Sequence, residues 1–157
     1  MTAVRFELDI EGLPHAVAAE IEGTYEAVVA FVRQHLPSGE IFLFERDKED
    51  SFRDAGGRKA IALVAHRAKS VLVNVQFEHQ SKAHKFPPST TVNTVLRWAV
   101  GKQGFNLDEN AAAKANLMRP GASEPLDRSL VIGTLFGHHE HELTLELTLK
   151  DFTNGTR

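Results

Sequence analysis

FPPSTTVNTVLRWAVGKQGF, residues 86–105, is the stretch that decides the fold. Two prolines and a Ser-Thr-Thr run form a stiff lead-in that can cap a helix, and Gly104 favours the end of that helix. Between these signals, apolar residues recur every three or four positions, which is the spacing of one buried helical stripe. The pattern predicts a helix from about Val92 to Lys102. Its inward stripe is expected to hold Val92, Val95, Leu96 and Ala99.

Strand patterns flank this helix on both sides. Upstream, valines alternate with other side chains over residues 71–78, and a second strand is expected through 79–86. Downstream, a short strand is expected at about 116–119, and the alternating LTLELTL of residues 143–149 is the clearest strand signal in the chain. A first and a last strand on either side of one helix predict a small mixed sheet wrapped around that helix, which is an α+β fold.

The first part of the chain repeats this order of elements. Strict alternation in residues 4–10 predicts a half-buried strand, and Thr24 offers an N-cap to a helix over about 25–35. Val28 and Leu36 are expected on its inward face, together with either Phe31 or Val32. The other expected strands are 15–22, 41–44 and 60–65.

These patterns divide the chain into two units. We expect an N-terminal unit at 1–66, a linker at 67–70, a second unit at 71–151 and a flexible, processed tail at 152–157. Units of this size lie near the lower limit for domains that fold without disulfides or metals. The two units are therefore expected to lean on each other. The linker holds neither glycine nor proline, which favours a semi-rigid dumbbell over two loosely tethered units.

Composition excludes several classes of function. The chain has 157 residues, a formal net charge of -3 at pH 7 and no cysteine. It therefore lacks the basic field that holds nucleic acid, and it has no thiol for a disulfide scaffold, a zinc ribbon or a nucleophile. Its longest apolar runs are far shorter than the roughly 20 residues that cross a bilayer, and no signal-like leader follows Met1. We expect a cytoplasmic protein that binds neither nucleic acid nor a membrane.

Several segments of the second unit together resemble ubiquitin. Residues 86–105 are similar to the end of its second strand, its helix cap and its helix end. Leu117-Met118 with the turn at 120–121 resembles its third strand and turn, and the LDRSL of 126–130 resembles its Asp-Gly-Arg-Thr-Leu loop. Residues 143–150 look like its last strand leading into the tail. This resemblance implies a β-grasp fold, and the matching element order of the first unit implies two tandem β-grasp domains.

Chains with two such domains resemble two groups of ubiquitin-like modifiers. One is induced by interferon, and the other is encoded in bacterial antiphage operons with an activating enzyme, a conjugating enzyme and a JAB-type metallopeptidase. The bacterial group is favoured for a cysteine-free chain. The resemblance implies a modifier that is not itself an enzyme, needs no cofactor and is joined to target proteins in antiviral defence, with phage structural proteins among the candidates. The alternative is a tandem β-grasp adaptor that binds proteins without being conjugated.

A modifier of this kind reacts through its last residues, because its terminal carboxylate must thread a narrow adenylating site. Members of the family usually end in Gly-Gly, which has no side chain to clash there. In this chain Asp151 and Phe152 stand at those positions. Three residues are candidates for the reacting terminus: Gly155 after trimming, Phe152, and the encoded Arg157. Gly155 is favoured because it has no side chain to clash. The alternative is that the tail has no role. The expected conjugation tail comprises Leu149, Lys150, Asp151, Phe152 and Gly155.

Three residues are expected on partner surfaces. The resemblance puts Met118 and Glu146 in the apolar patch that ubiquitin's readers bind. A carboxylate there is left unpaired on burial, so ordinary ubiquitin-binding domains are expected to be rejected in favour of dedicated partners. Trp98 lies off the buried helix stripe and is expected to be half exposed. It is expected either to pack against the first unit or the linker, or to anchor a partner protein.

One histidine-rich segment invites a zinc interpretation. In HHEHE, residues 138–142, His139 and His141 would share a strand face, and imidazole is a good zinc ligand. The sequence places no third ligand, so a solvated turn is favoured and no metal site is predicted. No glycine-rich phosphate loop, nucleophile elbow or His-Glu-x-x-His pair points to an enzyme.

Overall fold

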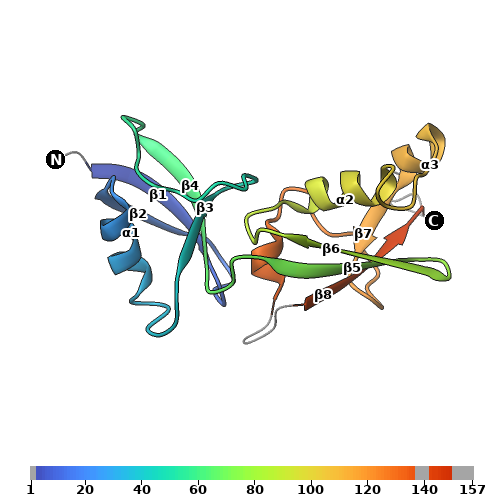
Figure 1. Ribbon diagram of the computed structural model, residues 1–157, viewed down its shortest axis with the longest axis horizontal. Helices are drawn as coiled ribbons and strands as arrows, with labels where there is room; N and C mark the ends of the chain where they lie inside the picture. Colours follow the sequence, from blue (N-terminus) through green and yellow to red (C-terminus); the bar gives the residue numbers. More distant parts are fainter. Residues whose placement is uncertain (1–2, 137–141, 150–157) are drawn as a thin grey trace.

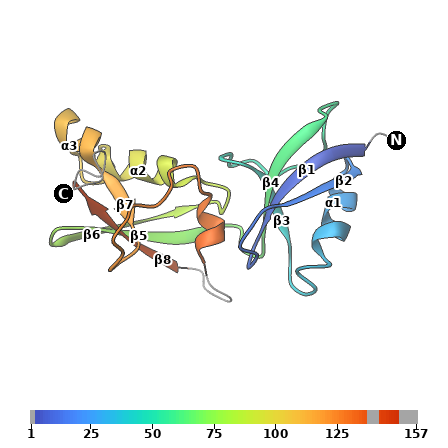
Figure 2. The same cartoon turned by 180° about the vertical axis from the view of Figure 1, so that it is seen from behind.

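A computed structural model describes residues 3–136 and 142–149 of the chain, and these residues form two units that lie side by side (Figure 1). Each unit has a four-stranded sheet, and the arrangement is seen from behind in Figure 2. Residues 67–70 connect the last strand of one sheet to the first strand of the other. No helix of the described residues has the length and apolar character needed to cross a bilayer.

The first sheet has the strand order β2-β1-β4-β3. Its central strands β1 (Ala3–Ile10) and β4 (Ala60–His66) run parallel, whereas β2 (Val17–Glu22) and β3 (Phe42–Glu45) pair with them antiparallel. The half-buried strand predicted from residues 4–10 is confirmed, because every second side chain of β1 is buried. These side chains share one core with helix α1 (Tyr25–Val32).

The second sheet repeats this order as β6-β5-β8-β7, again with a parallel central pair, β5 and β8. Mixed sheets with few helices fit the predicted β-grasp, and the two matching sheets suggest two tandem units. The elements of the second unit are β5 (Val71–Phe77), β6 (Gln80–Phe86), α2 (Val92–Val100), α3 (Glu109–Lys114), β7 (Asn116–Met118), the 3-10 helix η1 (Ile132–Leu135) and β8 (Glu142–Thr148).

Threonine side chains cap both main helices. The Thr24 hydroxyl accepts from the Ala27 N–H at 3.2 Å, and the Thr91 hydroxyl accepts from the Thr94 N–H at 3.3 Å. The inward stripe predicted for α2 is confirmed, because all four of its residues are buried. In α1 the buried residue is Val32 rather than the half-buried Phe31.

Both helices end earlier than predicted. After α1, the N–H groups of Gln34 and His35 bond three residues back, so the last turn tightens instead of continuing the helix to His35. After α2, Gly101 takes an extended ψ of -174°, which ends the helix before Lys102.

Some structure in the loops was not predicted. Helix α3 is short and buries no side chain, so it has no apolar period, and its clearest signal is the Asp108 carboxylate that accepts from the Ala111 N–H at 2.8 Å. Phe52, in the polar stretch after β3, is 1% exposed and lies edge-on to Phe6 with ring centroids 5.8 Å apart. A lone apolar residue in a charged loop gives no periodic signal of burial.

A carboxylate of the first unit caps a helix of the second. Asp47, in the loop after β3, accepts hydrogen bonds from the Thr91 N–H at 3.0 Å and from the Thr94 hydroxyl at 2.9 Å. The Asp47 N–H donates to the Ser89 carbonyl at 2.8 Å, and the Ser89 hydroxyl donates to the Lys48 carbonyl at 2.7 Å. A negative charge at a helix N-terminus is stabilising. The two units are thus joined by hydrogen bonds as well as by the linker.

A strip of the first sheet is also buried at this junction. Phe44 and Val64 pair across β3 and β4, and His66 follows two residues later on the same face, opposite α1. Their exposed fractions are only 3%, 1% and 0%. The His66 ring lies edge-on to Phe136 of the second unit, with centroids 6.1 Å apart. An outer sheet face is normally solvated, so this strip is an interface between the units.

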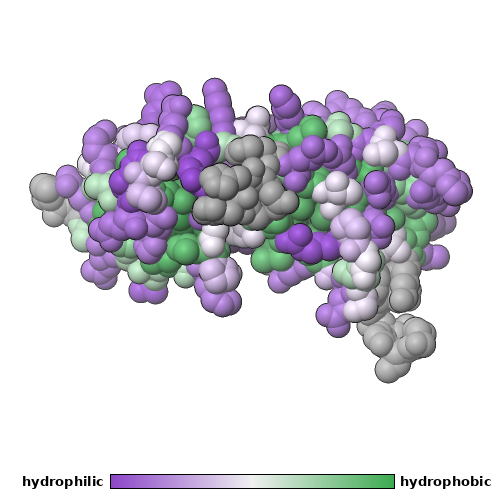
Figure 3. All heavy atoms as spheres, turned by 90° about the horizontal axis from the view of Figure 1, so that it is seen from below, coloured by the Kyte–Doolittle hydropathy of each residue, from purple (hydrophilic) through white to green (hydrophobic). Residues whose placement is uncertain are grey.

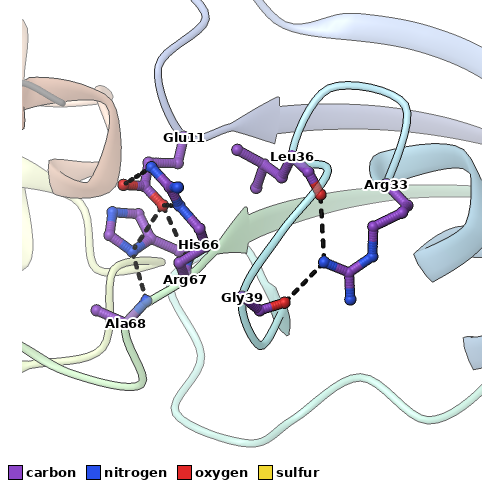
Figure 4. Close-up of polar contacts among 7 residues, drawn as sticks. All are labelled: Glu11, Arg33, Leu36, Gly39, His66, Arg67 and Ala68. Atoms are coloured by element: carbon purple, nitrogen blue, oxygen red, sulfur yellow. Dashed lines mark hydrogen bonds and ion pairs between the residues drawn. The ribbon is translucent and has the colours of Figure 1, made fainter. Parts of the chain in front are cut away.

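A buried ionic cluster lies where the chain leaves β4 (Figure 4). Glu11, 4% exposed, accepts from the Arg67 backbone N–H at 2.9 Å and from the Arg67 Nε at 3.1 Å. His66 Nδ1 accepts from the Ala68 N–H at 3.0 Å and lies 3.7 Å from Glu11, which assigns the imidazole proton to Nε2. Burial is the largest single effect and raises the pKa of Glu11, but the Arg67 hydrogen bonds and the charges of His66 and Arg67 together outweigh it and hold that pKa below its ordinary value.

We expect Asp47→Gly to weaken the junction. Glycine tolerates the φ of 59° at this position but removes the carboxylate from the start of α2, so the free energy of unfolding should fall by about 1 kcal/mol. Asp47→Asn keeps an acceptor oxygen and should lose less. Urea denaturation measures the stability, and residual dipolar couplings should fit one alignment tensor in the wild type but two in Asp47→Gly. Unchanged stability and a single tensor in Asp47→Gly would contradict the capping role.

The Glu11 cluster makes stability depend on pH. Because the pKa of Glu11 is lower in the folded chain than its ordinary 4.5, the carboxylate stabilises the fold above that pH, and the contribution disappears as the pH falls through the folded pKa. Glu11→Gln should lower the urea midpoint at neutral pH and flatten its decline on acidification. Glu20→Gln, at an exposed position, should keep the wild-type slope. Parallel wild-type and Glu11→Gln profiles would refute this assignment.

Candidate functional site: the last strand and its outer face

Strand β8 carries the chain from the core of the second unit towards its tail. It runs parallel to β5, with Leu143 beside Val73 and Leu145 beside Val75, and all four side chains are buried. Leu149, directly after β8, is half-buried and packs against the same core. Packing thus fixes the place where the tail begins. The other expected tail residues, Lys150, Asp151, Phe152 and Gly155, lie outside the described residues.

The fold brings two of the predicted partner residues together. Met118 on β7 and Glu146 on β8 are direct cross-strand neighbours, and Gln76 on β5 pairs with Glu146 from the other side. The three form a row on the sheet face opposite α2. Beside this row lies an open cavity of about 510 Å³, whose walls also include Glu78 and Ser123.

This outer face is polar. By register, β8 presents Glu142, Thr144 and Glu146 on it, and β5 presents Asn74 and Gln76 beside the half-buried Leu72. Figure 3, which looks from below the view of Figure 1, shows hydrophilic side chains over much of both units. A partner that covered this face with an apolar patch would strip these groups of their hydrogen bonds. The face therefore suits a partner that brings polar or charged groups of its own.

Met118 adds little apolar area to this face, because it is only 8% exposed. The turn after β7 supplies Gly121 and Ala122 to the same cavity, and Gly121 takes a φ of 79°, which L residues rarely adopt. At this position the second unit therefore presents a carboxylate beside a shielded thioether rather than an apolar patch.

Trp98 lies on a different part of the second unit. Its ring stacks on His84 with centroids 5.5 Å apart and lies edge-on to Phe86 at 5.7 Å. It is half-buried and packs on the core of its own unit. These ring neighbours lie on β6, on the sheet face opposite that of Met118 and Glu146. Packing of Trp98 against the first unit or the linker stays a prediction.

The loop after β7 supports that strand and thereby the outer face. The Arg128 guanidinium donates to the Ala115 carbonyl at 2.9 Å, and the Leu126 N–H donates to the Leu117 carbonyl at 2.8 Å. The Asp127 carboxylate accepts from the Ser129 N–H and hydroxyl, each at 2.8 Å, and these hydrogen bonds hold the pKa of Asp127 below its ordinary value. The segment that resembles ubiquitin's Asp-Gly-Arg-Thr-Leu loop is thus a hydrogen-bonded turn that fastens the edge strand.

Gln76, Glu78 and the turn at 121–123 were not predicted as parts of this site. The alternation of β5 contains the signal for Gln76, because it places that residue on the face opposite the valines. Glu78 has a φ of 56° in the turn between β5 and β6. Its approach to the cavity depends on that turn and is not encoded in a periodic pattern.

Metal ligands do not gather in the described part of the chain, where no three His, Asp or Glu side chains lie close enough to hold an ion. The segment 138–141, which holds the histidines of the zinc interpretation, lies outside the described residues.

The comparisons with known proteins bear on the second unit. Residues 72–150 match a family model described as BilA ubiquitin-like domain 2. A comparison with curated proteins finds no match for the chain. The matched region begins in β5, includes the whole of β8, and contains every segment that resembles ubiquitin in sequence. Because this match spans 79 of the 157 residues, the chain belongs to the family of BilA ubiquitin-like proteins.

Proposed function

We propose that the chain is a ubiquitin-like modifier of two tandem β-grasp domains, whose C-terminal carboxylate a partner enzyme activates and joins to amines of target proteins. Membership of the BilA ubiquitin-like family supports a modifier of the Bil system. The single observation that carries the proposal is the parallel pairing of β8 with β5, after which Leu149 leads the chain out at the end of the sheet. This geometry suits the delivery of a tail into a partner's site.

Joining a carboxylate to an amine requires activation, because a carboxylate is a poor electrophile. In the proposed sequence a tail oxygen attacks the α-phosphorus of ATP and pyrophosphate leaves. A partner thiolate then displaces AMP, and finally a target amine displaces the thiol. The chain has no cysteine, so the thioesters form on an activating and then a conjugating enzyme. The chain is a substrate rather than an enzyme and needs no cofactor of its own.

The tail sequence shapes the rest of the proposal. A JAB-type metallopeptidase would remove Thr156 and Arg157 and expose Gly155, which has no side chain to clash in a narrow channel. A terminus at Phe152 would instead need a wide apolar tunnel. We further propose that the modifier works in the bacterial cytoplasm in antiviral defence, with phage structural proteins among its targets.

The outer face of β8 is the proposed docking surface for the activating enzyme. Glu146 lies three residues before Leu149 and on the half-exposed side of the strand. An enzyme that draws the tail into its active site also meets this side of β8. Its contact with Glu146 and Gln76 then has to offer hydrogen-bond donors, because a buried unpaired carboxylate is costly.

We expect a chain that ends at Gly155 to be the reactive form. Incubated with ATP and the activating and conjugating enzymes of its own operon, it should form thioesters that thiol reductants cleave. Chains ending at Arg157 or Phe152 should react at least about tenfold more slowly, since a tenfold rate difference needs only about 1.4 kcal/mol of steric cost. Non-reducing gels and intact mass measure the adducts.

The remaining outcomes of this experiment are equally specific. A faster reaction of the Phe152 form would reject the assignment of the terminus but keep conjugation. If none of the three forms yields a thioester, conjugation is wrong. A chain that lacks residues 152–157 and still protects its host would then favour the adaptor, a possibility raised by the bulky Asp151-Phe152 pair.

Glu146→Arg should slow thioester formation without unfolding the chain. Reversing this charge places a cation where the partner is expected to offer donors, so the rate should fall by about tenfold, equivalent to about 1.4 kcal/mol. Glu20→Arg makes the same change on an exposed position of β2 in the first sheet and should leave the rate near that of the wild type. Equal rates for the two variants would show that the enzyme docks elsewhere.

A further inference from the structure

The free edge of the second sheet is a feature that the proposed modifier chemistry does not use. Strand β6 pairs with β5 on one side, and the strand order ends at β6 in the described part of the chain. Six of its seven residues are exposed. The outward N–H and C=O groups of such a strand form a template for one more strand.

Aromatic side chains line this edge on the helix side. By register, His84 and Phe86 lie on the same face of the sheet as the buried Val73 and Val71. His84 is exposed, contacts the Phe86 ring at 4.9 Å between centroids and stacks on Trp98 of α2. Figure 1 shows α2 lying over β5 and β6 on this side. An added strand would therefore meet an aromatic surface between the sheet edge and the helix.

The same region has the opposite charge to the chain as a whole. Residues 79–107 contain no aspartate or glutamate, although the whole chain has a net charge of -3. Lys82 and Lys85 lie on β6 itself, on opposite faces of the strand, and both are exposed. Asp47 reaches the start of α2, but its carboxylate is occupied by Thr91 and Thr94. The charge that complements this edge is therefore negative on both faces of an incoming strand.

We propose that β6 is a docking edge for an extended acidic segment of another protein, which adds to the sheet as a further strand. Backbone pairing along β6 gives the affinity, apolar side chains of the segment contact Trp98 and His84, and its carboxylates pair with Lys82 and Lys85. This inference goes beyond the proposed conjugation function, because it needs no reaction of the tail.

Three further roles of this edge are tested alongside the proposal. Lysines on an edge strand also discourage strand pairing in general. A second copy of the chain offers an acidic edge of its own, since β2 carries Glu20 and Glu22 at the end of the first sheet. Cationic and aromatic side chains together also suit a single-stranded nucleic acid.

Trp98 is the only tryptophan of the chain, so its fluorescence reports on this edge. The probe is a synthetic peptide of about eight residues, a common strand length, in which two valines one residue apart lie between pairs of aspartates. The valines then share one face, and each aspartate pair presents carboxylates on both faces. We expect saturable binding that changes Trp98 emission and weakens as salt is raised. A peptide with lysine in place of aspartate should not bind. A version with proline in place of a central valine should bind more weakly, because proline removes a backbone donor.

Charge-reversal variants locate the site. Lys82→Glu combined with Lys85→Glu should weaken peptide binding by at least about tenfold, the effect of losing roughly 1.4 kcal/mol. The control is Lys59→Glu combined with Lys114→Glu, which makes the same change at exposed positions away from β6 and should keep the wild-type affinity. Far-ultraviolet circular dichroism checks that all variants stay folded. Added peptide should also slow hydrogen exchange of the outward-facing N–H groups of β6 in the wild type.

Several outcomes would overturn the proposal. If the peptide does not bind, the role left for Lys82 and Lys85 is to prevent other strands from pairing with this edge. If both double variants lose the same peptide affinity, the change in net charge explains the loss and β6 is not the binding site. Unchanged exchange along β6 would exclude strand addition. Tight binding of an oligothymidine in place of the peptide would assign the edge to nucleic acid, and salt-sensitive dimers lost in Glu20→Lys would assign it to a second copy.

Discussion

The parallel pairing of the first and last strands of each unit is the constraint on which the rest of the structure depends. In the second unit, β5 and β8 place Val73 and Val75 beside Leu143 and Leu145, and all four are buried. A slip of one residue would turn the leucines of β8 to solvent and bring its threonines and Glu146 into the core. The register therefore fixes Glu146 on the outer face and starts the tail at Leu149.

The junction between the units depends on polar groups that a single domain would leave unsatisfied. Ser89 and Thr91 are buried at the start of α2, and the first unit supplies their partners through Lys48 and Asp47. Arg46 adds an ion pair to Asp9 at 3.6 Å and a hydrogen bond to the Ser129 carbonyl. Separating the units would expose an apolar strip and also remove the Asp47 hydrogen bonds from the start of α2. The described structure is therefore better regarded as one body with two sheets than as two tethered domains.

The regular spacing of apolar residues and the presence of helix-capping residues explain which parts of this fold are predictable from sequence. The alternation of β1 and β8 and the stripe of α2 follow local rules, and the structure confirms them. Helix α3 begins at a cap and Phe52 joins the core of the first unit, but neither lies in a repeating pattern of apolar residues. For the site, register places Glu146 beside Met118. The stacking of Trp98 on His84 depends on how α2 crosses β6, which no sequence spacing specifies.

The second unit separates its charges between two surfaces. The cavity on the outer face is bordered by Glu78 and Glu146, whereas the β6 edge bears Lys82 and Lys85 and no carboxylate. A partner with the charge that suits one surface is repelled by the other, and such repulsion contributes to specificity as much as attraction does. An enzyme that takes the tail at β8 and a protein that adds a strand to β6 therefore meet different surfaces, the sheet face opposite α2 and the outer edge of β6.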